Sequence, residues 1–166
     1  MDLKTISAID LAEAIRSKKI SSTEAVSSAL ERLKGVHEAF NAVVSTDAEE
    51  ALAAAKEVDA AVAASQQLGP LAGVPLAHKD MFDRAGKIPS WGARIRREKP
   101  CTEDATPIAR LKAAGSIQIA ALHMTEFAFG PTGHNYVIGH ARNPYDPTRI
   151  PGGSSSGSAI CVATGV

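Results

Sequence analysis

A glycine–serine run and a lysine far upstream are the residues of this chain whose types can do chemistry together. Residues 151–159 read PGGSSSGSA, so three serine hydroxyls stand side by side on a backbone that glycine frees for unusual conformations. Lys79 ends an apolar, strand-like segment, where burial favours the neutral amine that can accept a proton. Serine with a lysine base is a known way to activate a nucleophile. Together the two motifs predict amide-bond chemistry.

The glycine–serine run also fits three other kinds of segment. A flexible linker is disfavoured because Pro151 introduces the run and an apolar segment follows it directly. A phosphate-binding loop would close on a Lys-Ser or Lys-Thr pair, which the run lacks. Residues 153–157 match the G-x-S-x-G nucleophile elbow, but an elbow follows a buried strand, and residues 146–151 (DPTRIP) cannot form one. For Lys79, the simpler alternative is an exposed charge at the end of a strand.

The elements that must position these residues alternate between helix and strand. Capping patterns at Ser7 with Asp10 and at Ser21 with Glu24 predict two helices, the second of which ends at Gly35. The pattern next predicts a short strand at 41–44, an alanine-rich helix from Asp47 to about Ser65 and an apolar segment at 71–77. After these it predicts a helix from an N-cap at Thr106 to Gly115, a strand at 117–122, a long loop at 127–149 and a buried helix after Ser154. This order predicts an α/β sandwich.

Composition is that of an ordinary soluble globular protein. The 166 residues are 45% apolar and 22% charged, and 18 Lys plus Arg balance 18 Asp plus Glu. With no net charge, no overall field recruits nucleic acid or an anionic membrane. Cys101 and Cys161 make no disulfide framework, and the five histidines lack zinc-site spacing, so we expect no metal and no cofactor. Without a signal segment or a transmembrane stretch, we expect a cytoplasmic protein.

The motifs resemble those of the amidase signature hydrolases. The resemblance covers essentially the whole chain and rests on the order and spacing of residues 69–80 (GPLAGVPLAHKD), 125–130 (TEFAFG), 142–144 (RNP) and 151–155 (PGGSS). It implies an α/β/α fold, in which helices cover a mixed β-sheet that is incomplete in this chain, and a Ser–cis-Ser–Lys triad that cleaves or transfers carboxamide groups. It also implies that residues 1–166 are the N-terminal part of a single domain, with a helical region at 1–68 and the start of the catalytic core at 69–166.

Carried over to this chain, the resemblance implies catalytic roles for Lys79 and Ser154. Neutral Lys79 takes a proton through Ser154, the cis serine, from the attacking serine, and Ser154 later returns a proton to the departing amine. Ser155 supports this relay by hydrogen bonding, Gly153 accommodates the cis bond, and Gly152 belongs to the same supporting loop. The attacking serine belongs to a later TDTGGS motif that also supplies the oxyanion-hole amides. This sequence contains no such motif, and therefore no nucleophile of that kind.

The resemblance leaves the substrate and the status of the chain open. Ser156 stands where family members usually carry glycine, and neither it nor Ser158 replaces the nucleophile. One expectation is the N-terminal piece of an amidase, inactive alone; the other is a non-catalytic remnant or partner-binding module. Residues 127–130 (FAFG) favour a general amidase over the tRNA-dependent alternative, the amidase-type component of the glutamyl-tRNA(Gln)/aspartyl-tRNA(Asn) amidotransferase. The expected partner is a small-molecule amide, with no membrane and no direct nucleic acid outside the amidotransferase case. A homo-oligomer of a full-length parent stays open.

Overall fold

Helices pack on both sides of a small mixed sheet in the computed structural model, which describes residues 1–95 and 98–166. In chain order the elements are α1 (Ala8–Arg16), α2 (Ser22–Phe40), β1 (Val43–Thr46), α3 (Ala48–Ala63), β2 (Pro75–Lys79), α4 (Thr106–Ala113), β3 (Ile117–Leu122), the short 3₁₀ helix η1 (Glu126–Ala128) and α5 (Ser156–Thr164). The strand order is β1-β3-β2, with β1 antiparallel and β2 parallel to β3. The predicted mixed sheet covered by helices is confirmed.

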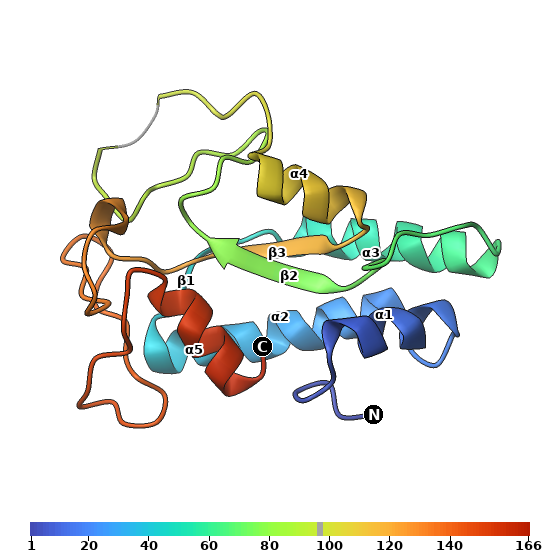
Figure 1. Cartoon of the computed structure of the whole chain (residues 1–166), viewed down its shortest axis with the longest axis horizontal. Helices are drawn as coiled ribbons and strands as arrows, with labels where there is room; N and C mark the ends of the chain where they lie inside the picture. The colour runs from blue at the N-terminus through green and yellow to red at the C-terminus, as the bar shows by residue number, and fades with distance from the viewer. Residues whose placement is uncertain (96–97) are drawn as a thin grey trace.

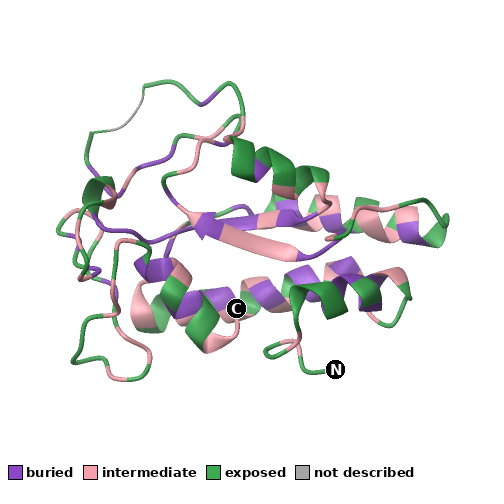
Figure 2. Ribbon diagram, viewed as in Figure 1, coloured by how far each residue is buried: buried purple, intermediate pink, exposed green. Residues whose placement is uncertain are grey.

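The central strand β3 carries the core. Its sequence IQIAAL leaves Gln118 half-buried and the other five residues buried, as expected for a strand that is covered on both faces. Figure 1 shows α4 on one side of the sheet and α1, α2 and α5 on the other. Val26 and Leu33 of α2 and Ile160 of α5 pack into the same cluster. The buried residues accordingly follow β3 and the inner helix faces (Figure 2).

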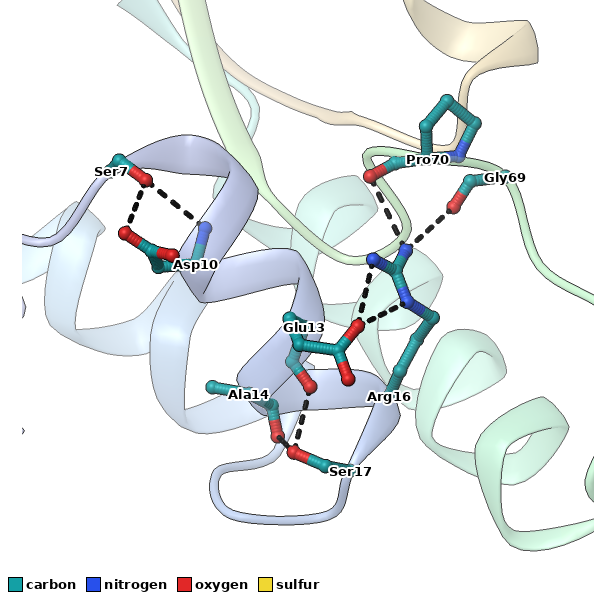
Figure 3. Close-up of polar contacts among 8 residues, drawn as sticks. All are labelled: Ser7, Asp10, Glu13, Ala14, Arg16, Ser17, Gly69 and Pro70. Atoms are coloured by element: carbon teal, nitrogen blue, oxygen red, sulfur yellow. Dashed lines mark hydrogen bonds and ion pairs between the residues drawn. The ribbon is translucent and has the colours of Figure 1, made fainter.

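Two N-caps begin α1 and α2 where the sequence predicts them. The Ser7 hydroxyl accepts the N–H of Asp10 at 3.1 Å (Figure 3). Ser21 and Glu24 form a reciprocal capping box, in which each side chain accepts the other residue's N–H at 3.0 Å. Both caps supply partners to amides that the first helical turn leaves unpaired.

Arg16 ties the end of α1 to the segment that leads into β2. Its Nη1 donates to the carbonyl oxygens of Gly69 and Pro70 at 3.3 Å each (Figure 3). Its Nε and Nη2 both donate to Glu13 Oε2 at 3.2 Å, which fixes the guanidinium on the helix. The first helix therefore helps to set where the strand that carries Lys79 begins.

The predicted end of the second helix at Gly35 is wrong. The helix α2 continues to Phe40, because Val36 and Phe40 pack against the core and outweigh the roughly 1 kcal/mol that glycine costs inside a helix. Asn41 ends the helix in the left-handed region, with φ of 54° and ψ of 52°. Its side-chain amide donates to the carbonyl of Ile138 at 3.1 Å, which supports that conformation.

The predicted helix start at Asp47 is confirmed, whereas the predicted N-cap of the fourth helix is wrong. Asp47 precedes α3, but its carboxylate makes no capping bond and pairs instead with Arg84 and Lys87. These ion pairs join the start of α3 to the segment after β2. The N-cap of α4 is Ala105, and Thr106 already lies inside the helix, so the predicted cap at Thr106 is wrong by one residue. The proline that follows sits in the first turn, where no N–H is needed.

We expect residues 1–166 alone to fold poorly. Both outer strands of the described sheet, β1 and β2, present an edge, and the side chains of Phe129 and Tyr136 are 92% and 86% exposed. Size-exclusion chromatography and a proteolysis time course measure this directly. Rapid digestion and large apparent size are the expected results, whereas a compact, protease-resistant monomer would favour the independent-module hypothesis.

Candidate active site

Lys79 and Ser154, the two residues expected to be catalytic, are in contact. Lys79 Nζ donates a hydrogen bond to Ser154 Oγ at 2.6 Å, across 75 positions of sequence. Lys79 is the last residue of β2 and pairs in register with Leu122, the last residue of β3. The N–H of Asp80 donates to the carbonyl of Leu122 at 3.0 Å and extends this pairing by one residue. The site therefore lies where the carboxyl ends of two parallel strands meet.

Backbone contacts bring Ser154 to this end of the sheet. The N–H of Thr125, just beyond β3, donates to the carbonyl of Ser154 at 3.1 Å. The Gly153–Ser154 peptide bond is cis. A Cβ atom at Gly153 would lie 2.7 Å from the carbonyl oxygen of Gly130 and 2.8 Å from the nitrogen of Gly133, so the segment can approach this closely only with glycine there.

The other members of the glycine–serine run take different positions. Gly152 has a φ of 86° and opens the turn that leads to Ser154. Ser155 is exposed, and within the part of the chain that the structure describes its side chain makes no hydrogen bond. Its expected support of the relay stays a prediction. Ser156 is fully buried and contacts Nδ1 of His123 at 3.1 Å. Of the three adjacent hydroxyls, that of Ser154 reaches the lysine.

The surroundings of Lys79 favour its neutral form. The side chain is half-buried, and burial lowers the pKa of Lys79 below its ordinary value. Its neighbour His78 is buried and, on a strand, points to the opposite face. Burial first, and the charge of Arg84 second, lower the pKa of His78 to about 4, so this ring is neutral near pH 7. The lysine is the residue of this pair that contacts a hydroxyl.

A buried polar network holds the loop that follows Lys79. The Asp80 carboxylate accepts both the N–H and the hydroxyl of Ser90, and all three groups are buried. The side-chain amide of Asn135 donates to the carbonyls of Gly92 and Met124, at 2.8 and 2.9 Å. Sequence reasoning missed Ser90 and Asn135, because both lie in glycine-containing segments without a period. Each is a polar residue two positions from a glycine, which is the weak signal that was available.

Other kinds of site find little support in residues 1–95 and 98–166. No group of three or more His, Cys, Asp or Glu side chains gathers there in a way that can hold a metal ion. Cys161 is buried, which raises the pKa of its thiol to about 11 and keeps it protonated. No helix in these ranges is both long and apolar enough to cross a membrane.

The family model described as Amidase matches residues 24–166, with Lys79 and Ser154 inside the matched region. The chain belongs to the amidase signature family. Its sequence is 42% identical over 162 residues to a component of the glutamyl-tRNA(Gln) amidotransferase of Acidothermus cellulolyticus, a match that covers 98% of this chain and 32% of that protein. The resemblance stated from the motifs is thereby confirmed at the level of the family.

Two solved structures have the same fold over nearly the whole chain. A protein from a vestigial complex connected with the origins of an s-triazine catabolic enzyme matches with a TM-score of 0.92 and 37% identity, over 96% of this chain and 35% of its own. A crystal structure of an amidase matches with a TM-score of 0.88 and 34% identity, over 96% of this chain and 36% of its own. The chain spans about a third of the length of the relatives it matches.

Proposed function

We propose that this chain is part of an amidase signature enzyme that cleaves carboxamide C–N bonds, with Lys79 as the base and Ser154 as the proton shuttle. The 2.6 Å contact between Lys79 Nζ and Ser154 Oγ carries this proposal. Family membership supports it independently, because the contact falls inside the matched region. The alternative of a non-catalytic partner-binding module does not explain this contact between a lysine and a serine.

The proposed proton path runs through two steps. Neutral Lys79 accepts the hydroxyl proton of Ser154 while Ser154 accepts the proton of an attacking serine, and that serine forms a bond to the amide carbon. When the C–N bond breaks, Ser154 gives its proton to the departing amine and regains one from Lys79. Residues 1–166 contain no TDTGGS motif, so in this proposal the attacking serine and the oxyanion-hole amides come from outside this segment.

A chimera tests the proposal. Residues 1–166 are joined to the remaining part of the solved amidase with 34% identity, in place of the corresponding segment. We expect this chimera to release ammonia from simple carboxamides, whereas the recipient part alone does not. A chimera that folds like the amidase but has no turnover would contradict the proposal.

A second function has its own support in the 42% identity to the glutamyl-tRNA(Gln) amidotransferase component from Acidothermus. In that case ammonia is transferred to a tRNA-linked acceptor rather than released. A second chimera, in which residues 1–166 replace the corresponding segment of the Acidothermus protein, decides between the amidase and the amidotransferase. Hydrolysis of simple carboxamides in the first chimera favours the amidase. Activity confined to the second, with glutamine as donor and the other amidotransferase components present, favours the amidotransferase.

The rate of the active chimera should rise with pH as Lys79 loses its proton. Since burial lowers the pKa of Lys79, the neutral base is available at lower pH than for a free lysine, whose pKa is about 10.4. The rising limb of a kcat–pH profile should therefore lie below that value and level off above the lysine pKa. Lys79→Ala should remove this limb. A limb that survives the substitution unchanged would assign it to another group.

A further inference from the structure

The buried ring of His123 is a polar group that the proposed reaction does not use. His123 follows β3 directly and is fully buried. Its Nε2 lies 2.8 Å from the carbonyl oxygen of Gly139, and its Nδ1 lies 3.1 Å from Ser156 Oγ. A carbonyl oxygen only accepts, so Nε2 carries a hydrogen. Burial lowers the pKa of His123 and favours the neutral ring, in which Nδ1 accepts the hydroxyl hydrogen of Ser156.

The backbone around His123 holds the same serine segment. The N–H of Gly157 donates to the carbonyl of His123 at 2.9 Å, and the N–H of Thr125 donates to the carbonyl of Ser154 at 3.1 Å. A Cβ atom at Gly157 would lie 2.3 Å from the carbonyl oxygen of Ala42 and 2.5 Å from the nitrogen of His123, so only glycine allows this approach. Residues 123–125 therefore form a cradle for residues 154–157.

Within this cradle, the bond between His123 and Ser156 is a contact between side chains. Ser156 stands two residues after Ser154, at the first residue of α5, and it occupies the position where the family resemblance leads one to expect glycine. A glycine there would have no hydroxyl for Nδ1. The ring also reaches the carbonyl of Gly139, so it joins the long loop to the start of α5.

We propose that His123 is a positioning residue for Ser154 and acts through Ser156. The His123–Ser156 bond fixes the start of α5 and, with it, the distance between Ser154 Oγ and Lys79 Nζ. This inference rests on the proposed function, because it assigns His123 a part in aligning that proton relay. It also explains why serine, rather than the expected glycine, stands at position 156: its hydroxyl holds the segment in place and does not attack a substrate.

Conservative replacements in the active chimera separate the two ring contacts. Asparagine at position 123 can place its amide oxygen near the site of Nδ1 and accept from Ser156, whereas glutamine reaches toward the site of Nε2 and Gly139. We expect His123→Ala and Ser156→Ala each to lower kcat by about 10- to 100-fold, the size of effect that small misplacement causes, with little change in KM. His123→Asn should restore most of kcat, and His123→Gln should not. The double alanine variant should be no slower than either single variant.

Ser27→Ala, at an exposed serine of α2, is the matched control for Ser156→Ala. The proposal would be overturned if His123→Asn and His123→Gln lost kcat equally and in step with their melting temperatures. It would also be overturned if the substitutions changed KM alone. In either case, turnover of the unsubstituted chimera would still support the proposed function. A crystal structure of the His123→Ala chimera decides the question even without turnover. Displacement of Ser154 from Lys79 supports the inference, and an unchanged 2.6 Å contact overturns it.

Discussion

Lys79→Ala and Ser154→Ala should each lower kcat of the chimera by about 10³-fold, within the range that positioned proton transfer contributes. Both side chains belong to one relay, joined by the 2.6 Å contact, so removing either one disconnects the base from the attacking hydroxyl. The double variant should therefore be about as slow as each single variant, because residues that act as a unit are not additive. Steady-state kinetics of the three variants measure this directly.

Two other substitutions serve as comparisons for this prediction. Lys56→Ala removes an exposed lysine of α3 and should leave kcat unchanged. His78→Ala should be much milder than Lys79→Ala, because the His78 ring points to the other face of β2. If His78→Ala proves as damaging as Lys79→Ala is expected to be, while Lys79→Ala keeps a near-normal rate, histidine is the base and the family assignment of roles fails.

Residues 1–166 alone should show no amidase turnover. They contain Lys79 and Ser154, but the sequence lacks the motif that the family uses for the nucleophile and the oxyanion-hole amides. Loss of a single oxyanion donor typically costs about 10²- to 10³-fold, and loss of the nucleophile costs more. Ammonia release from a simple carboxamide, followed against a buffer blank, is the measurement. Hydrolysis above the blank that disappears in Ser156→Ala would place the nucleophile within this segment.

Local sequence signals predicted the elements that depend on local physics. The strand at 117–122 was predicted at its observed bounds, because a continuous apolar run suits a central strand. The caps at Ser7 and Ser21 were predicted because their bonds span three residues. The end of α2 was not, since the packing of Val36 and Phe40 depends on distant parts of the chain.

In the candidate site too, the sequence indicated some residues but not the contacts between them. Family motifs drew attention to Lys79 and Ser154, but periodicity carries no information on a contact across 75 positions. The contacts of Asn135 with Met124 and of His123 with Ser156 were not predicted, because local periodicity carries no information on contacts that span 11 and 33 positions. For Ser155, the motif predicts a supporting hydrogen bond; its side chain is exposed, and the supporting role stays a prediction.

The wide separation of Lys79 and Ser154 along the chain determines when their contact can form. Contacts between residues that are distant in sequence form late, because a long loop must close before they can form. The lysine on β2 meets the serine only after β3 has paired with β2 and the segment from 151 to 157 has docked beside residues 123–125. A partly folded or nascent chain therefore holds the two groups apart. In the proposed enzyme, the lysine–serine proton relay therefore forms only in the folded chain.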